Sequence, residues 1–186
     1  MDTARHYSAD ELEQGVAHIL ETPKDGGELK LIVQRPEVDA RETPQHATLD
    51  VEQGLLGDNW LQRGSRHMPD GVADPEMQLN VMNSRVVDLV AGSEDRWALA
   101  GDQLFVDMDL GPDNLPPGTQ LELGDAIIEI TEPPHTGCKK FAARFGVDAM
   151  VFVNSGRGKE RNFRGICAKV VKSGDIQLGD LSLIHI

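Results

Sequence analysis

Hydrophobic and polar positions at the start of the chain predict a short helix followed by a strand. Apolar residues recur at helical spacing from Leu12 to Leu20, and Ser8 with Glu11 forms a capping-box pattern ahead of them. Residues 29–34 then alternate in a way typical of a strand that stops at Arg35-Pro36. We therefore divide the chain into a helical extension over residues 1–26 and a main domain over residues 27–186.

The next part of the chain is rich in turn-forming residues. Residues 36–74 contain many glycines and a Pro-Asp-Gly sequence, which predicts long ordered loops rather than regular elements. A strand is predicted over residues 77–82, and Asn83 is the predicted N-cap of a short helix that ends before Gly92.

Short strands dominate the rest of the pattern. Residues 104–110, 119–123 and 127–130 each predict a strand, and Pro133-Pro134 is expected to end the third. No internal repeat and no interdomain linker is visible. Many short strands with few helices predict a mainly β protein, built as a closed or nearly closed barrel.

Two short helices and a final strand are predicted after Cys138. Residues 139–145 and 147–154 favour helices, although Val151 to Val153 also permits a strand. A long strand is expected over residues 166–171, and Gly174 is expected to open a last hairpin.

Charge and hydropathy narrow the range of partners and locations. The formal net charge is -13, and an acidic surface repels a phosphate backbone, so we expect no nonspecific nucleic-acid binding. The chain has no apolar run of about 18 residues, and its N-terminus lacks a basic segment followed by an apolar one. We therefore expect neither a membrane span nor a secretory signal, and a cytoplasmic location.

One segment is basic within this acidic chain. Nine basic and two acidic residues lie between Lys139 and Lys172. Lysine and arginine donors bind phosphate-like anions, so this segment is a candidate pocket for an anionic small molecule. A solvated face that balances acidic neighbours is the alternative reading.

Cys138 is the strongest candidate for chemistry. It follows two prolines and a glycine at a predicted helix start, and Lys139-Lys140 follow it directly. A helix N-terminus and neighbouring ammonium groups lower a thiol pKa, and the thiolate is the form that binds soft metals or attacks electrophiles. An inert, half-buried thiol is the alternative, and it is the reading we favour for Cys167, which lies in the last long strand.

Four motifs together resemble a known family. They are Gly54-Leu55-Leu56-Gly57-Asp58-Asn59-Trp60, then Leu115-Pro116-Pro117-Gly118 with Leu123-Gly124-Asp125-Ala126, then His135-Thr136-Gly137-Cys138-Lys139-Lys140-Phe141, and Arg164-Gly165-Ile166-Cys167-Ala168-Lys169-Val170. In this order and spacing the chain resembles a standalone MOSC domain, the family named after the C-terminal domain of molybdenum cofactor sulfurase. The resemblance covers roughly residues 27–180.

The resemblance implies a MOSC-type mixed β-barrel with a few short helices and places the family's characteristic cysteine at Cys138. In molybdenum-binding members this cysteine is the protein's sulfur ligand to the metal of a molybdenum–pterin cofactor. The residues then expected to hold the anionic cofactor are His135, Lys139, Arg144, Arg164 and Asp58. The chain departs from many relatives at Gly101-Asp102-Gln103-Leu104, where they have Gly-Glu-Asn-Leu.

Three functions remain open from the sequence. The first is a molybdenum-dependent oxidoreductase that reduces small N-hydroxylated or N-oxide compounds and receives electrons from a separate protein. The second is a sulfur carrier that holds a persulfide on Cys138 and passes it to a partner. The third is a non-catalytic binding module that keeps the barrel and has lost the cofactor.

Overall fold

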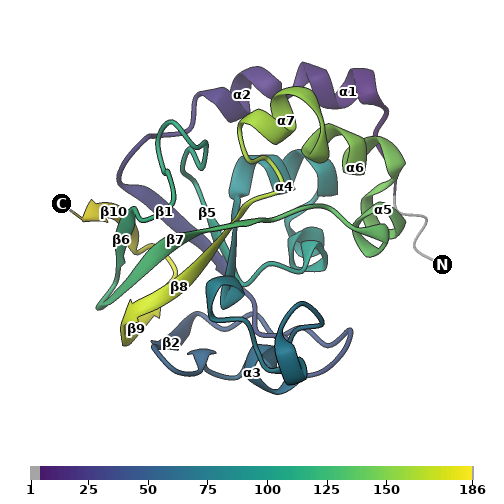
Figure 1. Ribbon diagram of the computed structural model, residues 1–186. Coiled ribbons are helices and arrows are strands. Elements are labelled where there is room, and N and C mark those ends of the chain that lie inside the picture. The colour runs from purple at the N-terminus through teal and green to yellow at the C-terminus, as the bar shows by residue number, and fades with distance from the viewer. Residues whose placement is uncertain (1–4, 186) are drawn as a thin grey trace.

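Seven strands close into a barrel in the computed structural model, which describes residues 5–185 (Figure 1). Neighbouring strands follow the order β1, β10, β6, β7, β8, β4, β5, and all pairs are antiparallel except the parallel pair of β4 and β5. The fold class expected from the sequence, a mainly β mixed barrel with short helices, is confirmed. The strands are β1 (Gly27–Ile32), β4 (Leu79–Asn83), β5 (Leu104–Val106), β6 (Gln120–Leu123), β7 (Ala126–Pro134), β8 (Ile166–Lys172) and β10 (Leu181–His185).

A second, three-stranded sheet corrects two predictions. It joins β3 (Gly54–Leu55), β2 (His46–Asp50) and β9 (Gly174–Gln177) in that order. The expectation of loops throughout residues 36–74 was therefore wrong for β2 and β3, because β2 shows no clean alternation and only Leu49 in it is fully buried. The expected final hairpin was also wrong, since β9 pairs with β2, and β10 pairs with β1 and β6.

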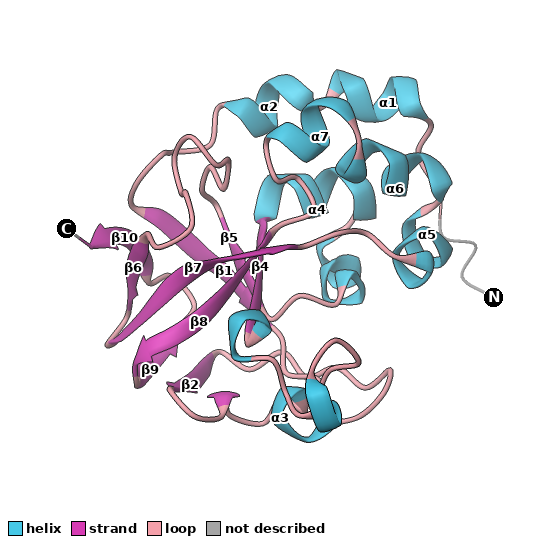
Figure 2. Cartoon of the chain, in the orientation of Figure 1, coloured by secondary structure: helices cyan, strands magenta, loops and turns pink. Residues whose placement is uncertain are grey.

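Helices α1, α2 and α4 to α7 lie together on one side of the barrel, whereas α3 lies apart from them, near β2 (Figures 1 and 2). The capping box of Ser8 and Glu11 is present, and the N-terminal helix is divided at Gly15. Asn83 caps the helix after β4, which ends at Gly92 in the left-handed conformation. The helical elements are α1 (Ala9–Gln14), α2 (Val16–Leu20), α3 (Trp60–Arg63), η1 (Pro69–Gly71), η2 (Pro75–Met77), α4 (Ser84–Ala91), η3 (Glu94–Ala100), α5 (Lys139–Phe145), α6 (Val147–Asn154) and α7 (Gly156–Glu160).

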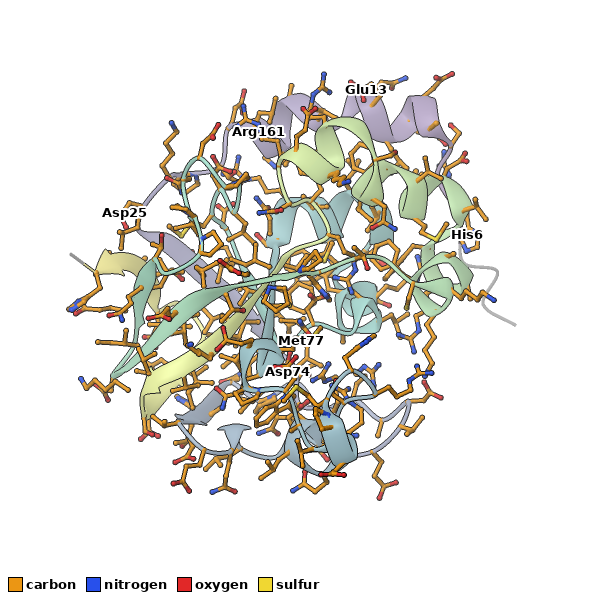
Figure 3. All side chains as sticks on the ribbon, in the orientation of Figure 1. His6, Glu13, Asp25, Asp74, Met77 and Arg161 are labelled. Carbon is orange, nitrogen blue, oxygen red and sulfur yellow. The ribbon has the colours of Figure 1, made fainter. Side chains whose placement is uncertain are left out.

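Two apolar clusters meet at β4 and β5. Val81 and Leu104 point into the barrel core, whereas Met82 and Phe105 pack with the helices. Successive residues of a strand face opposite sides, so these two strands form a wall between the clusters. Leu12 of α1 belongs to the helical cluster. Figure 3 shows His6 near α5 and α6, where its side chain lies close to Gly146.

Strand β7 runs through the two prolines that were expected to stop it. Its pairing with β6 ends near Glu129, and Pro134 pairs with Ile166 of β8 after a register shift. A proline is tolerated where no neighbouring strand needs its missing N–H. The strand therefore carries the chain past the barrel to α5, and this path sets the position of Cys138.

Within residues 5–185, no helix combines the length and apolar character required to cross a membrane.

Candidate functional site

Cys138 lies at a cavity of about 280 Å³ between the barrel, the loop after β1 and the start of α5. His135, Arg144 and Arg164 also line it, so four of the six predicted site residues meet here. Lys139 is exposed beside the cavity without lining it, and Asp58 is buried behind it. The basic residues of the cavity wall are Arg35, Arg41, Arg63, Lys140, Arg144 and Arg164.

The Cys138 thiol is exposed and stands directly before α5. Burial by itself would raise the pKa of this thiol, but the backbone N–H groups of Phe141 and Lys140 and the charge of Arg164 outweigh it and lower the pKa below its usual value. The thiolate is the nucleophilic and metal-binding form of cysteine. The helix start therefore favours the thiolate as predicted, but the positive charge that lowers the pKa comes from Arg164 and not from Lys139 or Lys140.

A side-chain amide fixes the loop that carries this thiol. The backbone N–H of Gly137 donates to Oδ1 of Asn154 at 2.7 Å, and Nδ2 of Asn154 donates to the Gly137 carbonyl at 3.0 Å. A Cβ at position 137 would meet the Asn154 amide at 3.1 Å, so glycine permits this close approach. Asn154 belongs to α6, and it thereby ties the position of Cys138 to the helical layer.

The two cysteines are expected to differ strongly in reactivity. Cys167 is fully buried, and burial raises the pKa of its thiol to about 12. At neutral pH we expect iodoacetamide to modify Cys138 at least about 100-fold faster than Cys167, because rate follows the accessible thiolate. Peptide mapping of native protein measures both rates. Labelling of Cys167 at a comparable rate in native protein would contradict this assignment. In the control variant Cys138→Ser, the rapid modification by iodoacetamide should disappear.

A buried ionic group lies behind the thiol. Asp102 is 0 % exposed, and its two carboxylate oxygens accept from Nε2 of His135 at 2.7 Å and from Nη1 of Arg164 at 2.7 Å. Burial opposes ionisation, but Arg164 and His135 outweigh it and lower the Asp102 pKa to about 2. The guanidinium of Arg164 also stacks 4.9 Å from the Phe141 ring centroid.

The state of His135 follows from these contacts. Burial and the positive Arg164 lower the pKa of His135, and the attraction of Asp102 only partly opposes them. The imidazole is therefore neutral at neutral pH. Because the Asp102 carboxylate can only accept, Nε2 carries the hydrogen and Nδ1 is left as an acceptor. The imidazole side chain is 13 % exposed and lines the cavity.

Four consecutive backbone carbonyls hold four arginines around the cavity. Arg41 donates to Ala98, Arg144 to Leu99, Arg164 to Ala100 and Arg35 to Gly101, at 3.2, 2.7, 3.0 and 2.8 Å. These carbonyls lie at the end of η3, where carbonyls run out of helical partners, and among the described residues only that of Ala98 also accepts from a cap N–H, that of Gly101 at 3.4 Å. A single short segment thus positions four cations on one wall.

Asp58 secures the same wall from inside. Its carboxylate accepts from the Arg35 guanidinium at 2.7 and 2.8 Å, from the Arg35 backbone N–H at 2.9 Å and from the Trp60 backbone N–H at 3.1 Å. Its side chain is 1 % exposed. Any effect of Asp58 on a ligand therefore passes through Arg35, which lines the cavity.

Two buried polar atoms at this site have no partner among the described residues. They are Nε of Arg164 and Oδ1 of Asn59, and both residues line the cavity. An unpaired buried polar atom is costly in a folded protein. Each atom therefore keeps an unused hydrogen-bonding capacity at the cavity wall.

The sequence missed several residues of the site. Asp102, Asn154, Arg35 and Arg41 all act through contacts between distant segments, and only Asp102 stood in a motif that drew attention. A larger hollow of about 500 Å³ lies at β2 and β9, but neither Cys138 nor any lysine or arginine lines it, and three aspartates do. Across residues 5–185, no cluster of three or more His, Cys, Asp or Glu side chains could hold a metal ion.

Comparisons with known proteins show the fold. No protein-family model and no curated protein matches the sequence. Among solved structures, YuaD from Bacillus subtilis is 14% identical, with a TM-score of 0.56 over 86% of this chain and 97% of that one. YiiM from Escherichia coli is 18% identical, with a TM-score of 0.53 over 86% of this chain and 70% of that one. YiiM is a MOSC-domain protein, so this chain has a MOSC-like fold.

Proposed function

We propose that this protein belongs to the MOSC family and binds a molybdenum–pterin cofactor in the Cys138 cavity, as an oxidoreductase for small N-hydroxylated or N-oxide compounds. The observation that carries the proposal is a thiol with a lowered pKa in a cavity walled by six basic side chains. A thiolate suits a soft metal, and guanidinium groups suit a phosphate. The four sequence motifs and the MOSC-like fold support the same reading.

The donor set of the cavity fits such a cofactor. Cys138 offers one soft ligand, and a metal already held by an organic cofactor needs little more from the protein. Arg144 and Arg164 would hold the anionic part, with Lys139 adding positive charge at the rim. The Nε of Arg164 has no partner among residues 5–185, so this residue keeps one unused donor. When bound, the cofactor supplies the redox chemistry of oxygen-atom transfer.

The protein's own contribution is orientation and proton transfer. The Asn154 clamp on Gly137 fixes the loop of Cys138, and the Phe141 and Lys140 backbone N–H groups lower the pKa of its thiol. Reduction of an N-hydroxy group to an amine releases the oxygen as water, which requires protons. The neutral His135, held in one tautomer by Asp102, can exchange a proton through Nδ1 with groups in the cavity. Electrons would come from a separate protein in the cytoplasm.

Molybdenum content tests this proposal. The parent chain, purified from a host that makes the cofactor, is expected to carry about one molybdenum per chain, because a soft thiolate holds the metal. Cys138→Ser should lose most of it, whereas Cys167→Ala should retain it, since that thiol is fully buried. Elemental analysis measures the metal in all three proteins.

Absence of molybdenum from the parent, or equal content in the parent and in Cys138→Ser, would refute the proposal. Persulfide analysis of Cys138 in the fresh protein would then test the sulfur-carrier alternative, which needs the same exposed thiolate.

A further inference from the structure

Five of the six basic residues of the cavity wall fall into two groups by the acids that balance them. The sixth, Arg63, is exposed and pairs with no carboxylate among residues 5–185. Arg35 and Arg164 are buried, and each is paired with its own buried aspartate, Asp58 and Asp102. Arg41, Arg144 and Lys140 stand nearer the opening, and the only carboxylate paired with any of them among residues 5–185 is that of Asp39. The outer group therefore keeps an excess of positive charge.

Asp39 meets this outer group from an exposed loop. Its Oδ1 lies 3.2 Å from Nη2 of Arg144 and 3.6 Å from Nζ of Lys140, and its side chain is 66 % exposed. Burial and the charge of Arg144 lower the pKa of Arg41, and Asp39 is close enough to oppose that effect. The backbone of Asp39 has a φ of 64°, a left-handed conformation uncommon for a residue with a side chain.

An anion with more charge and more acceptor oxygens than a carboxylate can replace Asp39 in these ion pairs at little cost in free energy. Ion pairs this exposed contribute at most about 1 kcal/mol. A phosphate-type group brings up to two negative charges and three acceptor oxygens, and it can accept paired N–H bonds from a guanidinium. The Ala98 and Leu99 carbonyls already hold Arg41 and Arg144 in place. Fixing these two side chains around a ligand therefore costs little conformational free energy.

We propose that Arg41, Arg144 and Lys140 form a binding subsite for a phosphate-type oxyanion, and that the Asp39 carboxylate occupies this subsite until the ligand displaces it. Asp39 is thus a built-in competitor that keeps adventitious anions out of the cavity. The inference rests on the proposed function only for the identity of the molecule that carries the oxyanion.

Titration of the metal-free full-length protein with inorganic phosphate at low ionic strength and neutral pH tests the subsite. Asp39→Asn is expected to bind phosphate about 3-fold more tightly than the parent, because an exposed competing ion pair is lost. The matched control is Glu37→Gln, which removes one negative charge from the same loop and the same cavity wall. Within the described chain Glu37 pairs with no cation, so this variant should gain clearly less than Asp39→Asn.

Arg41→Gln tests the subsite in the opposite direction, because it removes one of the cations that would bind phosphate. It should weaken phosphate binding about 10-fold, the usual effect of losing a charge-assisted hydrogen bond. Equal gains in Asp39→Asn and Glu37→Gln, parent-like binding by Arg41→Gln, or no phosphate binding by either the parent or Asp39→Asn would overturn the proposal. Because these titrations use metal-free protein, they remain decisive if the molybdenum experiment fails.

The source of the oxyanion is identified by the molybdenum content of Arg41→Gln. A loss of metal together with phosphate binding would support the subsite as a holder of the cofactor. A parent-like metal content with lost phosphate binding would support it as a holder of the substrate. The second result would define the substrate class as anionic.

Discussion

Replacement of Asp102 by alanine is expected to destabilise the fold by about 3–5 kcal/mol, the usual cost of removing one partner of a buried ion pair. Asp102 is fully buried and balances the buried Arg164, which would be left with an uncompensated charge. Among residues 5–185, Asp102 is the only hydrogen-bond partner of the His135 side chain, and this contact would be lost as well. Urea unfolding followed by fluorescence or circular dichroism measures the free energy of unfolding.

The pH dependence provides a check on the same contact. The Asp102 pKa is about 2 in the folded protein and 3.8 for an ordinary aspartate, so its stabilisation is complete above 3.8 and is lost as the pH falls toward 2. The pKa of His135 is also lowered, so its contribution is complete above 6.5 and declines below it. Asp102→Ala should therefore lose less stability than the parent as the pH falls from 4 toward 2.

Asp39→Ala is the control for this prediction. Its exposed ion pairs should cost no more than about 1 kcal/mol when removed. If Asp102→Ala were no more destabilised than Asp39→Ala, the buried network of Asp102, His135 and Arg164 would contribute little to the folded state.

Elements that depend on residues close together in the sequence could be predicted. Elements that depend on pairing with a distant segment could not. Asn83 and Ser8 were recognised because a cap lies within three residues of the N–H it accepts. Strand β2 was missed because it pairs with β9, more than 120 residues later, and its own residues are mostly polar. The run through Pro133-Pro134 was missed because only the full topology shows that β6 ends before them.

The same distinction holds for the site. Cys138 could be proposed as a candidate because the thiol and the helix start are adjacent in sequence. The stretch from Gly101 to Leu104 was read as a departure from the family pattern, and the structure shows an Asp102 carboxylate there that engages His135 and Arg164. The row of carbonyls that holds four arginines has no sequence signature, since every residue type supplies a backbone carbonyl.

Replacement of Asp58 by alanine is the second change expected to cost about 3–5 kcal/mol, again because a buried partner charge is left alone. The Asp58 carboxylate accepts from the Arg35 guanidinium and from the backbone N–H groups of Arg35 and Trp60. Arg35 in turn donates to the Gly101 carbonyl, so the variant should loosen residues 35–60 from the cavity wall. Urea unfolding gives the loss of stability, and hydrogen exchange of residues 35–60 locates it.

A double variant separates the charge from the packing. If the cost comes from the unpaired guanidinium, Asp58→Ala combined with Arg35→Met should be more stable than Asp58→Ala alone, because no buried charge then lacks a partner. The backbone N–H groups of Arg35 and Trp60 would still lack their acceptor, so recovery should be partial. A double variant less stable than Asp58→Ala would instead show that Arg35 stabilises the wall mainly through its contact with Gly101.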